Sequence, residues 1–304
     1  MAGPADPLQL TAAGEPAPVA PVTLRASALA WQRLRRSSNL VVGASILVLV
    51  LAAAFLAPTL APYDPVDQEF TSQLRAPSAA HFFGTDEFGR DIFSRVIFGA
   101  RIALNVGVLA DLIATGLGVL LGVASGFFGG RTDALVTRLI DIMLAFPYLL
   151  LAMIVVAILG PGLTNAMVAI AVVYTPQFAR VVRGVVLSVK EQDFVESARA
   201  MGAGTARILT QSILPNIVSP IIVMATLTIG FMIVETAGLS FLGLGASPPT
   251  PEWGSMLATG RSFMLTAPWI ATFPGVAILV TVVAFNLVGD GLRDLLDPRL
   301  RGRI

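Results

Sequence analysis

The residues that could do chemistry are few in this 304-residue chain. It has no cysteine, one histidine (His81) and one lysine (Lys190). The lack of cysteine excludes disulfides, thiolate metal sites and cysteine nucleophiles, and a lone histidine falls short of the three or four protein ligands that zinc takes. Lys190 follows no glycine-rich loop, so the chain lacks the phosphate-binding motif it would need to hydrolyse ATP. We therefore predict no directly bound cofactor or metal, and no catalytic residue.

One pair of carboxylates, Asp86 and Asp91, is close enough in sequence to suggest acid–base work. Glycoside hydrolases use such pairs, but no substrate cleft is evident around this one. Three arginines lie in the same stretch, Arg90, Arg95 and Arg101. We expect the acids to pair with these arginines and to hold an amphipathic segment against the outer face of the protein.

The composition indicates that these residues belong to a protein built from membrane-spanning helices. The chain is 55% hydrophobic and 13% charged, whereas soluble domains carry about 25% charged residues. Six apolar stretches approach or exceed the roughly 20 residues that span a bilayer. They are rich in glycine and alanine and several contain proline, which favours helices over barrel strands. The predicted fold is all-α, with six transmembrane helices over residues 40–57, 102–126, 138–160, 164–186, 217–243 and 270–289.

The basic residues predict how the helices are oriented. If the N-terminus is cytoplasmic, fifteen of the twenty lysines and arginines lie inside, as the positive-inside rule expects. Both termini are then cytoplasmic. We expect four regions: a disordered tail (1–28), a first helix with an extracytoplasmic loop (29–101), the main transmembrane domain (102–290) and a C-terminal tail (291–304). The run 40–57 is read as a retained first helix rather than a cleaved signal.

Two carboxylates, Asp111 and Glu235, lie inside apolar runs. Burying a charge at the centre of a bilayer costs about 2.5–3.5 kcal/mol on insertion scales, so each should face the bundle interior, water or a partner. They could line a solute path or serve as buried hydrogen-bonding anchors, and the sequence leaves both open. Tyr174 and Gln177, which flank Pro176, are further candidates for a path lining.

A stripe of small residues, Gly118, Gly122 and Gly126, repeats every four positions. In lipid such a stripe lets two helices approach closely. It could form an internal contact or an interface with another subunit, and we favour the internal contact.

The most informative stretch is the polar inner loop 187–216, which is predicted to form two short helices. Asp193 is a plausible N-cap, with Glu196 three residues later as in a capping box. Gly202 can end the first helix in a left-handed turn, and Pro215 should break the second before the next membrane helix.

This first short helix has two readings. Phe194, Ala198 and Met201 share one predicted face, which fits an amphipathic helix lying on the membrane surface. Its middle, however, is small (Ser197 and Ala198), and small side chains suit insertion into a groove on another protein.

The second reading is supported by a resemblance. The loop resembles the EAA loop of permease subunits from binding-protein-dependent ABC importers: Glu-Ala-Ala, three residues, Gly, nine residues, an apolar residue, one residue, then Leu-Pro. The matching positions are Glu196, Ala198, Gly202, Leu214 and Pro215. Ser197 replaces the middle alanine, and Ser212 also departs mildly from the pattern.

Three other blocks, within residues 83–101, 239–254 and 286–299, are similar to permeases of the peptide/nickel branch. The resemblance covers about residues 30–302 and is strongest to the second of the two permeases in dipeptide or oligopeptide importers. It implies the type I ABC importer permease fold, in a prokaryotic cell membrane.

The resemblance also implies partners and roles. These are a homologous second permease, two ATPase subunits that hold ATP and Mg²⁺, an extracytoplasmic binding protein and the lipid membrane, with no nucleic acid. Glu196 would dock into an ATPase cleft, with Ala198 and Gly202 shaping the contact. Peptide is the expected cargo. A nickel or other solute importer remains an alternative, and so does a secondary transporter, which would need no docking loop.

Overall fold

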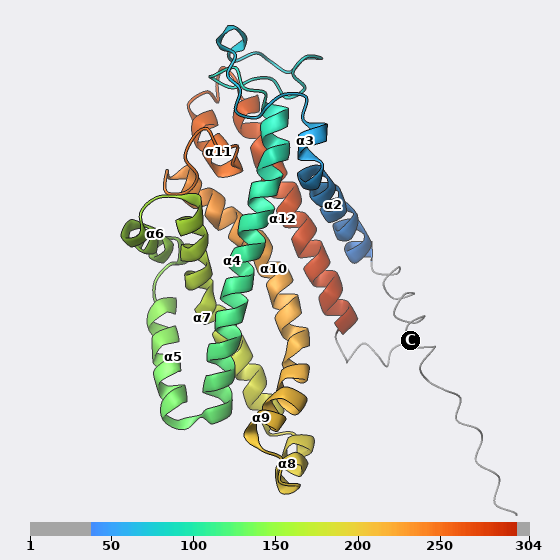
Figure 1. The fold of residues 1–304 in the computed structure, drawn as a ribbon, viewed down its shortest axis with the longest axis vertical. Helices are drawn as coiled ribbons and strands as arrows, with labels where there is room; N and C mark the ends of the chain where they lie inside the picture. The colour runs from blue at the N-terminus through green and yellow to red at the C-terminus, as the bar shows by residue number, and fades with distance from the viewer. Residues whose placement is uncertain (1–37, 297–304) are drawn as a thin grey trace, which may run out of the picture.

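The computed structural model describes residues 38–296, which are almost entirely helical, with one isolated bridge between Thr85 and Asp91. The predicted tail 1–28 and the last residues of the predicted C-terminal tail lie outside this range. Five helices are long and apolar enough to cross a membrane, and they run side by side along the long axis of the molecule (Figure 1). They are α2 (Ser38–Phe55), α4 (Ile92–Phe128), α7 (Leu163–Lys190), α10 (Leu214–Phe241) and α12 (Trp269–Leu296).

The predicted crossing over residues 138–160 differs from expectation. Instead of one helix over 138–160, the chain forms α5 (Gly130–Leu144) and α6 (Tyr148–Leu159), which meet at an angle of 98°. The break falls at Pro147, which precedes the first residue of α6. Proline disfavours helical geometry in the residue before it, so the helix ends there. The predicted crossing is therefore a bent pair of helices, and counted as one span it makes six.

Short elements gather at the two ends of the bundle (Figure 1). One end carries the loop between α2 and α4, with α3 (Ala57–Leu60) and the short helix η1 (Phe70–Ser72), and lies near α11 (Trp253–Arg261). The opposite end carries α8 (Asp193–Ala200) and α9 (Thr205–Ile208), which project beyond the long helices. The first predicted short helix of the loop 187–216 is therefore confirmed as α8, whereas the second, α9, runs on into α10.

The glycine stripe brings α4 against α7, the most extensive helix contact in the bundle. A Cβ atom added at Gly118 would lie 2.3 Å from Cβ of Phe178, and one at Gly122 would lie 2.6 Å from the carbonyl oxygen of Ala179. Because side chains larger than hydrogen do not fit there, the stripe is an internal packing surface, as favoured from the sequence.

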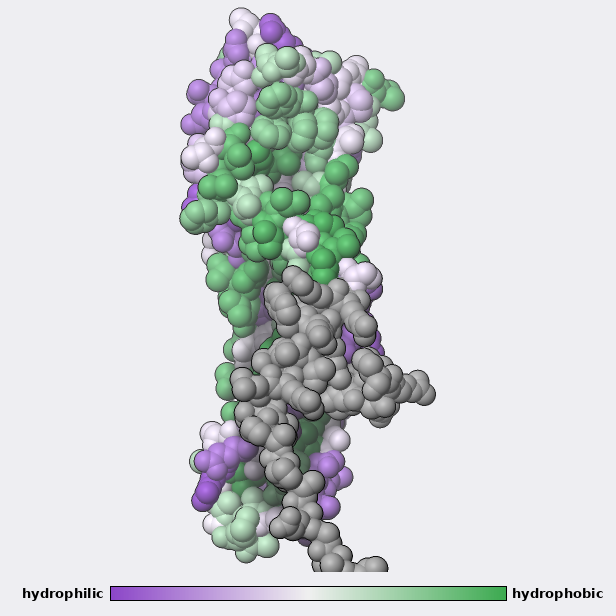
Figure 2. Space-filling model, turned by 90° about the vertical axis from the view of Figure 1, so that its right-hand side faces the viewer, coloured by the Kyte–Doolittle hydropathy of each residue, from purple (hydrophilic) through white to green (hydrophobic). Residues whose placement is uncertain are grey.

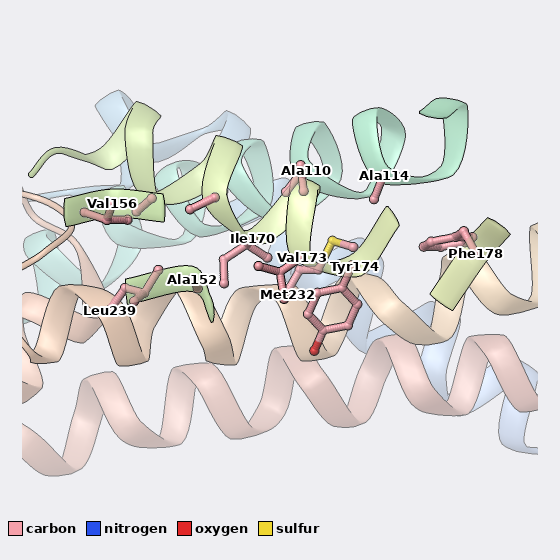
Figure 3. Packing of buried hydrophobic residues seen from close by; sticks show 13 residues of the cluster. Ala110, Ala114, Ala152, Val156, Ile170, Val173, Tyr174, Phe178, Met232 and Leu239 are labelled. Carbon is pink, nitrogen blue, oxygen red and sulfur yellow. The ribbon is translucent and has the colours of Figure 1, made fainter. Parts of the chain in front are cut away.

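The largest buried cluster follows the same seam and extends to α6 and α10. Figure 3 shows alanines of α4 (Ala110 and Ala114) beside Ile170 and Val173 of α7, with Met232 from α10 closing the cluster. Small residues on one helix opposite larger ones on the next let the backbones come close, which is how helices gain contact in a lipid solvent.

Two ion pairs join α5 to α7. The guanidinium of Arg183 binds both carboxylate oxygens of Asp133, at 2.6 and 2.7 Å, and Nη2 of Arg180 lies 2.7 Å from Oδ1 of Asp141. Two-point pairing of arginine with a carboxylate fixes direction as well as distance. These contacts hold the first half of the bent pair along α7.

Apolar side chains also cover much of the outside. Val48 and Leu49 of α2 are exposed, as are Leu120 of α4 and Leu279 of α12. Figure 2 shows a broad apolar region on the side of α2 and α12. An apolar exterior on long helices is expected when the surrounding solvent is lipid.

Candidate functional site

A cavity of about 760 Å³ opens between α6, α7, α10 and α12. This is within the range of ordinary small-molecule sites. Its walls are mainly apolar, with a few polar side chains from α7 and α10 and one arginine near the end of α12. The lining residues used below are Tyr148, Tyr174, Gln177, Ser219, Thr228 and Arg293.

Two of the four predicted path residues lie in this wall. Tyr174 is buried and its ring stacks on that of Tyr148, with centroids 5.3 Å apart. Gln177 is half-buried one turn further along α7. Pro176 lies between them inside the helix. The structure therefore brings Tyr174 and Gln177 to one cavity, together with an aromatic partner on α6 that the sequence did not indicate.

The two intramembrane carboxylates do not line this cavity. Asp111 is 3% exposed, and its Oδ1 accepts a hydrogen bond of 2.5 Å from Oγ1 of Thr228 on α10. Thr228 is itself in the cavity wall, so Asp111 lies directly behind it. This geometry fits the anchoring alternative for Asp111. Glu235 is half-buried, and among the described residues its carboxylate has no hydrogen bond or ion pair.

The second candidate site is the projecting helix α8. Its N-cap is Gln192, and Asp193 is its first helical residue. No side chain caps the helix, so the predicted capping box of Asp193 and Glu196 is wrong. Gly202 follows with φ of +81°, which confirms the predicted left-handed end because glycine adopts that conformation without strain.

The face of α8 that packs inward is not the shared face of Phe194, Ala198 and Met201. Val195 is fully buried, whereas Phe194 is 47% and Met201 81% exposed. Ala198 is partly buried against the same cluster as Val195. Helical spacing groups Phe194, Ala198 and Met201 on one face. The side of α8 that contacts α7 and α9 is instead the neighbouring one, which carries Val195. Two large apolar side chains are left bare at the tip of the protein.

The helix does not break at Pro215. A π-helical turn, η2 (Leu209–Ile213), joins α9 to α10, and Pro215 lies in the first turn of α10. Proline is tolerated in a first turn, because the amide hydrogen it lacks has no helical partner there. The helical run Thr205–Phe241 is therefore continuous, and the predicted break is wrong.

The remaining residues of the motif are accessible. Glu196 and Ser197 are exposed on α8, and neither side chain has a hydrogen-bond or ion-pair partner in the described part of the chain. Leu214 and Pro215 are exposed where α10 begins. The projecting helix thus carries both the exposed acidic residue of the motif and the exposed apolar side chain of Phe194.

The carboxylates at the opposite end are used within the fold. Oδ2 of Asp86 lies 2.6 Å from Nε of Arg90 and 3.6 Å from Nε of Arg95, as expected. Asp91 instead pairs with His81, at 3.0 Å, and caps α4. Arg101 is exposed and takes no part in the network, so its predicted pairing is wrong.

Burial perturbs two acids at this end. It raises the pKa of Glu87, whose Oε2 has no hydrogen-bond partner among the described residues. Burial also raises the pKa of Glu252, which caps α11 through bonds from the backbone N–H groups of Gly254 and Ser255. Trp253 at the start of α11 is 1% exposed, and its Nε1 donates a hydrogen bond to the carbonyl of Val96.

Comparison with known proteins gives consistent matches. Residues 118–302 match the family described as binding-protein-dependent transport system inner membrane component. Residues 27–77 match the N-terminal transmembrane domain of oligopeptide transport permease C. The dipeptide transport system permease protein DppC of Alkalihalophilus pseudofirmus is 47% identical over 272 residues, which is 90% of each chain. The glutathione transport system permease protein GsiD of Escherichia coli is 48% identical over 273 residues, again 90% of each.

Among solved structures, the inward-facing MetNI methionine ABC transporter matches with a TM-score of 0.56. The match covers 67% of this chain and 97% of that one, at 20% identity, and so supports the fold alone. The described helices have the arrangement of a type I ABC importer permease. This chain belongs to the family of binding-protein-dependent transport system inner membrane components and is a multi-pass membrane permease of the peptide ABC importer type.

Proposed function

We propose that this chain forms half of the translocation pathway of an ATP-driven importer for di- or oligopeptides, and that α8 couples it to an ATPase subunit. The observation that carries the coupling role is the tip of α8. There an exposed acid, Glu196, is carried on the same short helical segment as the exposed apolar side chains of Phe194 and Met201. A charged group beside exposed apolar anchors is typical of a surface that a protein partner covers.

The buried side of α8 is packed tightly against the long helices. Val195 packs into a cluster with Val182 and Val186 of α7, with Ile213 at the end of η2 and with Ile217 in the first turn of α10. Close-packed interiors are stiff and transmit displacement. A push on α8 would therefore reach both α7 and α10.

Those two helices also form the cavity. Tyr174 and Gln177 lie on α7, and Ser219 and Thr228 lie on α10. Moving the two helices against each other would change the shape of this wall. Coupling between the ATPase and the path thus needs only elements that are already packed together.

The proposal extends to the wider assembly. ATP and Mg²⁺ would be held by two separate ATPase subunits at the α8 end, which is then cytoplasmic, as are both chain termini. A homologous second permease would complete the path. An extracytoplasmic binding protein would deliver cargo at the opposite end, to the segment that holds Asp86 and Arg90.

Peptide cargo is supported by the chemistry of the cavity. Its polar groups include the hydroxyl of Tyr174, the amide of Gln177 and the hydroxyl of Ser219, and no described carboxylate or histidine lines it. Hydroxyl and amide groups suit a peptide backbone, whereas a nickel ion favours imidazole and carboxylate ligands. Relatives named for dipeptide and glutathione transport agree with this choice.

The decisive experiment reverses the charge of Glu196. In the complete transporter, Glu196→Arg should abolish ATP-dependent peptide uptake and weaken co-purification of the ATPase subunits, while the amount of permease in the membrane stays unchanged. Removing one partner of a water-shielded charge pair costs about 2–5 kcal/mol. The matched control is Glu191→Arg, at an exposed acid just before α8, which should retain uptake. Normal uptake by the Glu196 variant, or equal loss in both variants, would contradict the coupling role.

A further inference from the structure

A second cavity, of about 240 Å³, lies on the other side of the bundle between α2, α4 and α12. No residue lines both cavities. Its walls include Val50 and Ala53 of α2, Val96 of α4 and Phe273 of α12, and Phe83 and Trp253 close it near the end opposite α8. The cavity therefore belongs to neither the candidate path nor the coupling helix.

The lining offers no free hydrogen-bonding side chain. Its two polar side chains are Thr281 and Trp253. The hydroxyl of Thr281 donates to the carbonyl of Ala277 in its own helix, and Nε1 of Trp253 donates to the carbonyl of Val96. A water molecule needs two to four polar partners to be held in a cavity. The ligand that fits such a lining is a hydrocarbon.

The mouth of the cavity opens toward lipid. Val276 and Val280, at the rim on α12, are 49% and 39% exposed, and Leu49 on α2 is 69% exposed. Figure 2 shows the apolar region on this side of the molecule. A groove within the membrane span, apolar and open to the bilayer, faces hydrocarbon chains at very high local concentration.

We propose that this cavity is a binding site for one acyl chain of a membrane phospholipid, which lies between α2 and α12 against Trp253. The acyl chain would fill the cavity and supply contacts that the surrounding side chains otherwise lack. It would also fix α2 against the rest of the bundle. Since no charged side chain lines the cavity, the site recognises the acyl chain of the lipid and not its headgroup.

The test uses the complete transporter in lipid nanodiscs. The discs contain phosphatidylcholine and a small fraction of phosphatidylcholine with a photoreactive diazirine on one acyl chain. After illumination, labelled residues are mapped by mass spectrometry. We expect labelling on wall residues such as Val96 and Phe273, and equal labelling when the probe carries a phosphatidylglycerol headgroup. The interior residue Val173, which is 1% exposed, should stay unlabelled.

Filling the cavity provides the matched comparison. Ala53→Phe places a ring in the cavity and should reduce wall labelling about tenfold. Leu49→Phe, on the same helix but outside the lining, should leave it unchanged. If Ala53→Phe fails to assemble, Ala277→Leu fills the same space from α12. Wall labelling no higher than that of Val173, or equal labelling in the filled and control variants, would overturn the proposal. Such results would mean that the cavity is empty or covered by another protein.

Discussion

Thr228 on α10 donates a hydrogen bond to the buried carboxylate of Asp111 on α4, over 2.5 Å between Oγ1 and Oδ1. This contact ties together two helices whose sequences are 117 positions apart at these residues. It also connects the wall of the larger cavity to the helix behind it, because Thr228 faces both.

Replacing Thr228 by valine should destabilise the protein by about 2 kcal/mol, because the buried acid loses its partner while side-chain shape is kept. The measurement is the thermal unfolding midpoint of the purified protein in detergent. Thr226→Val is the matched control, since that hydroxyl donates only to the carbonyl of Ile222 in its own helix. Equal shifts in the two variants would show that the bond to Asp111 contributes nothing.

The contact between α4 and α7 predicts a sharp difference between two glycines of one helix. Gly118→Ala places a methyl group 2.3 Å from Cβ of Phe178 and should cost about 1–3 kcal/mol through overpacking. Gly116→Ala has open space around it and should be neutral or stabilising by up to about 1 kcal/mol. Unfolding midpoints of both variants check this, and a neutral Gly118→Ala would refute the packing argument.

If the larger cavity is a water-filled path, a cysteine at Gln177 should react with a charged, membrane-impermeant thiol reagent. The absence of native cysteine makes every label attributable to the introduced residue. Leu120→Cys, exposed on α4 toward lipid, should react poorly because thiolate forms only in water. Similar labelling of the two variants in the assembled transporter would argue against an aqueous cavity.

Glu252 should make stability depend on pH in a definite direction. Burial raises its pKa above the ordinary value of 4.5, so above that pH the unfolded chain ionises this acid more readily than the folded one, and folding loses stability as pH rises. Glu252→Gln removes this contribution. As pH rises from 4.5 to neutral, the unfolding midpoint of the variant should therefore increase relative to that of the wild type. A constant difference would contradict the direction of the shift.

Sequence patterns predicted the long helices well because lipid imposes a simple rule. A run of about 20 apolar residues must satisfy its own backbone hydrogen bonds. Helices α4, α7 and α12 each contain one of the predicted stretches, and α10 covers its stretch up to Phe241. The bend at Pro147 was missed because the apolar run continues through it. Composition reports the solvent around a segment, but not the direction of its axis.

Side-chain partners were harder to predict. The pairs Arg183–Asp133 and Asp91–His81 depend on how separate segments pack, which local spacing does not encode. On α8, helical spacing indicated which residues share a face but not which face the fold buries, and the buried Val195 became apparent only from the structure. The motif around Glu196 was recognised from its pattern, and its accessibility became apparent only from the fold.

The continuity of the chain through Pro215 has a mechanical consequence. The unbroken run Thr205–Phe241 is about 55 Å long at 1.5 Å per residue, and α8 is attached at its lower end. A tilt of about 5° around that end would swing the other end by about 5 Å, again by simple geometry of the rod. A modest movement at one membrane surface would thus be magnified at the other.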